Sequence, residues 1–123
     1  MEREGTVRRL CEWYRRSSCF SVETAALPGW RGKRPPASAE HAPDLVVRAD
    51  LGPTRGPEIC FSVEEWDALG SERLYERLSA LIAAWGEDGV RLVLPRRGAS
   101  PEARRRAERI ARVAGLSFPP IYA

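Results

Sequence analysis

The sequence of 123 residues has no apolar run approaching the roughly 20 residues that span a bilayer. We therefore expect no membrane-spanning segment. Its first residues, 1–5, lack the basic-then-apolar order of a secretory signal peptide. The three cysteines are odd in number and widely spaced, which favours reduced thiols over a disulfide framework. Together these absences predict a cytoplasmic protein with no membrane attachment.

Lysine and histidine are almost absent. Lys33 is the only lysine and His41 the only histidine, so arginine supplies nearly all the positive charge behind the formal net charge of +3. Arginine suits phosphate contacts because its planar guanidinium donates two parallel hydrogen bonds. The codon bias of a GC-rich genome explains the same excess, so arginine content alone is weak evidence of nucleic-acid binding. The cysteines and His41 also lack the close spacing typical of zinc ligands.

The apolar pattern predicts one α/β domain over residues 1–123, because this length buries a real core but is too short for two domains. Helical spacing covers residues 6–16, 71–85 and 100–114. Strand alternation covers residues 19–25, 43–49, 57–63 and 90–94, with a proline-interrupted edge strand over 116–122. Residues 27–42, rich in Pro, Gly and Arg, are expected to form a long loop. The expected order is αβββαβαβ, a small mixed β-sheet flanked by helices.

Two of these expected strands each begin with an acid. Asp44 follows Pro43, Glu58 follows Pro57, and the turn-rich residues 50–56 separate the two strands. If the strands pair as a hairpin, the two carboxylates are expected to converge at one end of the sheet. Paired carboxylates on adjacent strands hold hard divalent cations such as Mg²⁺. Each acid also has an ordinary interpretation, as a strand-end or turn residue that binds local backbone amides or water.

With this element order and these acids, residues from about 6 to 93 resemble the PD-(D/E)XK nuclease superfamily, which has the restriction-endonuclease-like fold. Pro43 and Asp44 match the "PD" of the family motif, and Glu58 matches its "(D/E)". The resemblance implies that Asp44 and Glu58 bind one or two Mg²⁺ ions. It also implies that an acid on the first helix, Glu12, completes the site. In a nuclease of this kind, Glu12 or Glu23 would assist the two metal ligands.

The family lysine is missing from its usual place, two residues after the second acid, where Cys60 stands. A thiol is neutral or anionic and cannot stabilise negative charge on phosphate, and an ordinary Cys60 would be a small buried hydrophobe. Some members of the superfamily move the lysine to another element. Lys33 is the one residue available for that role.

Candidate nucleic-acid contacts lie in two segments. Trp30, Arg31 and Arg34 combine an aromatic ring with basic side chains in the expected loop, a combination that stacks a base and holds a phosphate. Arg104 and Arg105 belong to a basic run on the last expected helix. The alternatives are a loop anchored by one tryptophan and a solvated helix face.

Two hypotheses of function follow. The first is a Mg²⁺-dependent nuclease, in which the metal activates water for phosphodiester hydrolysis and nucleic acid is the substrate. The second is a catalytically inactive module of the same fold that binds nucleic acid or a protein partner, as a homodimer or as a subunit of a larger complex. Cys60 favours the second hypothesis, and a displaced Lys33 keeps the first open.

Overall fold

The computed structural model describes residues 2–17, 19–24, 43–51 and 54–123, so the expected loop over residues 27–42 lies outside the described part. The elements along the chain are α1 (Glu2–Arg15), β1 (Phe20–Glu23), β2 (Leu45–Leu51), β3 (Thr54–Val63), α2 (Glu72–Trp85), β4 (Val90–Leu94), α3 (Pro101–Val113) and β5 (Ile121–Tyr122). The mixed α/β class expected from the sequence is confirmed. None of the helices in the described ranges is long and apolar enough to cross a membrane.

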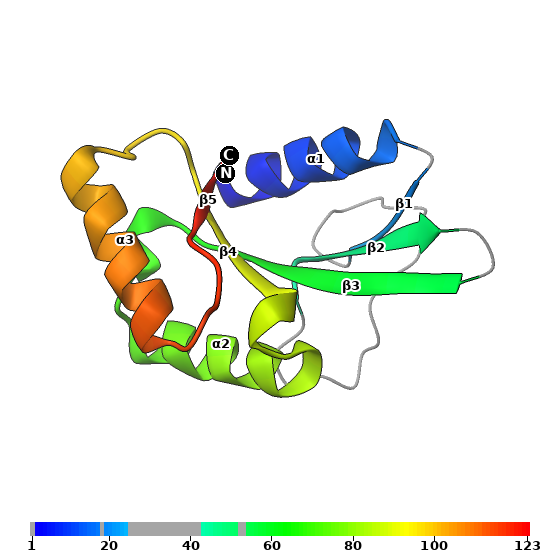
Figure 1. Ribbon diagram of the computed structural model, residues 1–123. Coiled ribbons are helices and arrows are strands. Elements are labelled where there is room, and N and C mark those ends of the chain that lie inside the picture. The colour runs from blue at the N-terminus through cyan, green and yellow to red at the C-terminus, as the bar shows by residue number, and fades with distance from the viewer. Residues whose placement is uncertain (1, 18, 25–42, 52–53) are drawn as a thin grey trace.

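The five strands form one mixed sheet in the order β1-β2-β3-β4-β5 (Figure 1). The first three strands make an antiparallel meander, while β4 runs parallel to β3 and β5 runs parallel to β4. Parallel neighbours need a crossover connection, and α2 and α3 supply the two crossovers. The strands led by Asp44 and Glu58 are therefore adjacent, as expected.

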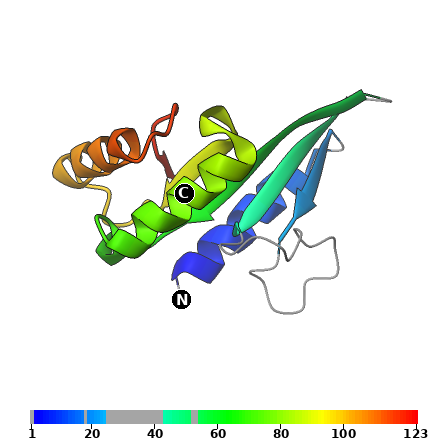
Figure 2. The same ribbon diagram turned by 90° about the horizontal axis from the view of Figure 1, so that it is seen from below.

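Helices cover both faces of the sheet. Helix α1 lies on one face, and α2 and α3 lie on the other (Figures 1 and 2). Consecutive residues of β2 divide between the two cores, because Val46 packs with α2 and α3 whereas Val47 packs with α1. This central part of the sheet is thus buried on both sides, which explains its continuous apolar sequence.

Helix α2 follows the sequence expectation closely. The hydroxyl oxygen of Ser71 accepts a hydrogen bond from the Leu74 backbone N–H at 3.2 Å, and Gly86 ends the helix with a φ of 79°. The apolar stripe packs on the sheet as expected. Its fully buried members are Leu74, Leu78 and Leu81, and its half-buried members are Ile82 and Trp85.

Other boundaries differ from the sequence expectation for local reasons. Helix α1 begins at Glu2 rather than near residue 6, because one glycine costs a helix only about 1 kcal/mol. Strands β2 and β3 extend into the expected turn, and an irregularity in their register beyond Arg48 accommodates Pro57. Strand β5 is limited to Ile121–Tyr122, since Pro119 and Pro120 cannot donate to a ladder.

Candidate functional site

Asp44 lies just before β2 and is almost completely buried, with 3% of its surface exposed. Its Oδ1 atom accepts a hydrogen bond from Nη2 of Arg3. Its Oδ2 atom accepts from Nη2 of Arg77 at 2.8 Å and from the Val63 backbone N–H at 2.7 Å. The backbone carbonyl of Asp44 accepts from the hydroxyl of Thr24 at 2.6 Å. Both carboxylate oxygens are therefore engaged by protein donors.

The partners of Asp44 come from both layers of helices. Arg3 belongs to α1 and Arg77 to α2, which cover opposite faces of the sheet. Arg3 also donates from Nε to the Val63 carbonyl at 3.0 Å, so it holds the end of β3 as well. The carboxylate thus ties the two helical layers to the sheet at one end of the molecule.

A second acid completes this group, which we call the Asp44 cluster: Arg3, Asp44, Glu64 and Arg77. The Nε atom of Arg77 lies 3.5 Å from Oε1 of Glu64, and the buried Ser62 hydroxyl donates to the same oxygen at 3.0 Å. The cluster contains two cations and two anions, so its formal charges balance. Burial of charge is tolerated in this form, with every charge paired.

Glu58 lies away from this cluster, so the expectation that the two carboxylates converge is wrong. In the antiparallel pairing Leu45 lies opposite Phe61, whereas Glu58 lies opposite Arg48. Asp44 lies four positions before Arg48, which at about 3.3 Å per residue corresponds to roughly 13 Å along the strand. The Glu58 carboxylate is partly exposed and lies 3.6 Å from the Arg48 guanidinium.

Cys60 is a core residue, as its ordinary interpretation predicted. It is fully buried on the face covered by α2 and α3. Burial raises the pKa of its thiol to about 12, so the side chain is neutral at physiological pH. The position two residues after Glu58 therefore offers neither a charge nor access to solvent.

The remaining catalytic candidates are also dispersed or lie outside the described part. Glu12 is exposed on α1, nine residues beyond Arg3, or about 13 Å along a helix axis at 1.5 Å per residue. Glu23 is half-buried on β1 opposite Val46. Lys33 lies outside the described residues. Across the described ranges, no three His, Cys, Asp or Glu side chains are grouped so that they could hold a metal.

The geometry around Asp44 does not fit a divalent cation. A hard cation such as Mg²⁺ takes carboxylate oxygens together with waters in a near-octahedral shell. At Asp44 two guanidinium groups and a backbone N–H occupy these directions, and the side chain is shielded from solvent. A cation at this position would have to displace both arginines.

The predicted nucleic-acid contacts are only partly described. Trp30, Arg31 and Arg34 lie outside the described residues. Arg104 places its guanidinium 4.7 Å from the centre of the Tyr122 ring and donates from Nε to the Ala99 carbonyl at 3.0 Å. Arg105 is exposed on α3.

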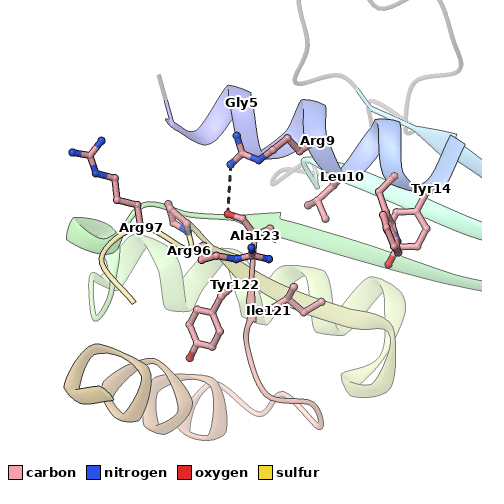
Figure 3. Close-up of a pocket in the computed structure, with 11 residues that line it drawn as sticks. Gly5, Arg9, Leu10, Tyr14, Arg96, Arg97, Ile121, Tyr122 and Ala123 are labelled. Atoms are coloured by element: carbon pink, nitrogen blue, oxygen red, sulfur yellow. Dashed lines mark hydrogen bonds between the residues drawn. The ribbon is translucent and has the colours of Figure 1, made fainter. Parts of the chain in front are cut away.

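A groove of about 940 Å³ lies on the α1 side of the molecule, between α1, the loop after β4 and the strand β5 (Figure 3). Its lining includes Arg9 and Trp13 of α1, Arg96 and Arg97 of the loop, and Ile121 of β5. The sequence reasoning missed this surface because its residues come from three segments far apart in the chain. The exposed Trp13 on an otherwise charged helix face was the available signal.

The composition of the Asp44 cluster was also missed, although two signals in the sequence pointed to it. In a hairpin, residues at equal distances from the turn lie opposite each other, so Asp44 lies beside Ser62 rather than Glu58. Glu64, two positions after Ser62, is therefore the acid nearer to Asp44. Arg77 lies beside the apolar stripe of α2, where a charged residue indicates a buried ion pair. Comparison of the chain with protein-family models, curated proteins and solved structures finds no match.

Proposed function

We propose that this chain is a non-catalytic binding module with a restriction-endonuclease-like fold. The finer fold assignment is supported by the element order, in which α1 precedes an antiparallel meander and α2 crosses over to a parallel β4. This order matches the αβββαβ arrangement that the sequence resemblance implies. Within that fold, the Asp44 cluster takes a structural role in place of a metal site.

The observation that carries the proposal is the engagement of both Asp44 carboxylate oxygens by Arg3, Arg77 and the Val63 backbone N–H. A metal-dependent nuclease needs an open carboxylate that accepts a cation and, through it, water and phosphate. A buried carboxylate closed by two guanidinium groups instead stabilises the fold. The distance of Glu58 from Asp44 and the burial of Cys60 support the same conclusion.

A cleavage assay tests the proposal. Wild-type protein is incubated with single- and double-stranded DNA and RNA in the presence of Mg²⁺ or Mn²⁺, beside the variants Asp44→Asn and Glu58→Gln. Glu76→Gln is the matched control, since Glu76 is an exposed acid on α2. We expect no divalent-dependent cutting by any of the proteins. Cutting by wild type and Glu76→Gln that is lost in the other two variants would establish a nuclease and overturn the proposal.

A further inference from the structure

Helix α1 leaves part of its face of the sheet open beside β5, and the groove described above occupies that space. Leu10 of α1 and Ile121 of β5 contribute apolar surface to it (Figure 3). Its volume of about 940 Å³ falls at the upper end of the range typical of ligand sites, and it is open to solvent. The groove is thus large enough for an extended ligand.

The charged side chains that line the groove are all positive. Arg9, Arg96 and Arg97 line it, and the described residues of its lining include no acid. Arg9 is oriented by a hydrogen bond to the Thr6 hydroxyl at 3.1 Å. It also donates to the Ala123 carbonyl at 3.5 Å (Figure 3). Arg96 and Arg97 are exposed, and within the described ranges neither forms an ion pair with an acid. Such a surface attracts a ligand with repeated negative charge.

An aromatic platform accompanies the arginines. Trp13 lines the groove with 66% of its surface exposed, a large apolar area for a side chain on a surface helix. A tryptophan in this setting offers a flat ring face to a planar partner.

The loop that carries Arg96 and Arg97 is held in place. The indole N–H of Trp66 lies within hydrogen-bonding distance of the Pro95 and Arg97 carbonyls, at 3.0 and 2.8 Å. Gly98 has a φ of 91°, and a Cβ atom there would lie 3.1 Å from the Trp66 ring. The Arg96 backbone N–H also donates to the Ala123 carbonyl at 2.9 Å. The arginines therefore project from a fixed backbone, which lowers the entropic cost of binding.

We infer that this groove binds single-stranded nucleic acid, with a base stacked on Trp13 and phosphates held by Arg9, Arg96 and Arg97. An acidic peptide offers the charge without a planar ring at each repeat, and a duplex offers the charge with its bases enclosed. A single strand offers both at every nucleotide. The inference rests on the proposed function, because it names a ligand for the proposed binding module. The residues of the groove are separate from the Asp44 cluster.

Fluorescence anisotropy with a short labelled oligothymidylate tests the inference. Trp13→Ala is expected to weaken binding about tenfold, because stacking contributes about 1–3 kcal/mol per base, and Trp13→Phe should retain part of the affinity. Three phosphate contacts predict a slope of about −2 for log K against log salt, and Arg97→Ala should reduce its magnitude by about 0.7. Arg73→Ala is the matched control, since it removes the same charge from an exposed position on α2.

The inference would be overturned by no binding at low salt, by unchanged binding of both Trp13→Ala and Arg97→Ala, or by equal affinity for a labelled polyglutamate. Loss of binding by Arg105→Ala, with the groove variants unchanged, would place the contact on α3 and also reject it. Circular dichroism and melting of each variant establish that the fold is retained. Cutting that depends on Asp44 would refute the proposed function without altering these binding results, so the two failures are distinguishable.

Discussion

Replacing Asp44 with alanine removes the acceptor of the Val63 backbone N–H and one partner from each of two guanidinium groups. Arg3 keeps the Val63 carbonyl, and Arg77 keeps Glu64, at 3.5 Å. Breaking a buried ion pair by removing one partner typically costs about 3–5 kcal/mol. Arg77 dominates this cost, because its side chain is 14% exposed, whereas Arg3 is 42% exposed and can be hydrated. We therefore expect Asp44→Ala to lower the free energy of unfolding by about 3–5 kcal/mol. This is a large part of the roughly 5–15 kcal/mol that stabilises a typical domain.

Urea denaturation of wild type, Asp44→Ala, Arg77→Ala and the double variant measures the coupling between Asp44 and Arg77. The same set with Arg3→Ala in place of Arg77→Ala measures the coupling between Asp44 and Arg3. We expect about 1–3 kcal/mol for Asp44 with Arg77, and less than about 1 kcal/mol for Asp44 with Arg3. Glu58→Ala is the control, because its partly exposed ion pair with Arg48 should contribute at most about 1 kcal/mol. Asp44→Ala should also lower the melting temperature by roughly 10–20 °C.

A different result would refute the structural role of Asp44. Acids that serve as metal ligands often add nothing to the stability of the fold, or lower it, when the metal is absent, because function is retained at the expense of stability. An Asp44→Ala variant within about 0.5 kcal/mol of wild type, or more stable than it, would therefore contradict the reasoning. The absence of coupling to Arg77 would contradict it as well.

Four further predictions concern the core and the thiols. Leu78→Ala should cost about 2–5 kcal/mol in urea denaturation, because Leu78 is fully buried beneath the sheet; a loss below about 1 kcal/mol would contradict that packing. Cys60→Lys should produce no cleavage. It should also lower the free energy of unfolding by about 4 kcal/mol or more, the equivalent of a pKa shift of about 3 units for a buried lysine. An unchanged melting temperature would contradict this loss of stability. A thiol reagent at pH 8 should label native Cys19 rapidly but not Cys11 or Cys60, because burial raises their pKa values to about 11 and about 12; rapid labelling of all three would contradict this. As pH rises above 9, the thiols ionise in the unfolded state before they ionise in the folded state. The free energy of unfolding should therefore fall by about 1.4 kcal/mol per pH unit for each buried thiol. The fall should be less steep in Cys60→Ala than in wild type.

The sequence was sufficient to predict most of the regular elements. The stripe from Leu74 to Trp85 has a helical period and a serine N-cap, and the apolar run over Val90–Leu94 is bounded by turns. These patterns depend only on residues close in sequence, so they predict the elements without knowledge of the tertiary structure. The bounds of β2 and β3 were less predictable, because they depend on how the hairpin closes.

The candidate site was harder to predict because it depends on register. The side chains of a strand alternate with a period of two, so both Glu58 and Ser62 lie on the same face as Asp44, and only the pairing decides which is its neighbour. The partners Arg3 and Arg77 reach Asp44 from helices on opposite faces. The position of Arg77 beside an apolar stripe indicates an ion pair, but no local pattern identifies Asp44 as its partner. The groove was unpredictable for the same reason, since its three walls come from segments that are distant in the sequence.

Paramagnetic Mn²⁺ tests most directly whether the Asp44 carboxylate is closed to a cation. The Val63 backbone N–H donates to Oδ2 of Asp44 at 2.7 Å, so its amide resonance reports on any cation bound there. We expect this resonance to stay sharp during a titration with Mn²⁺, because two arginines and the N–H already occupy the carboxylate. Selective broadening of the Val63 amide at substoichiometric Mn²⁺, lost in Asp44→Asn, would contradict the account.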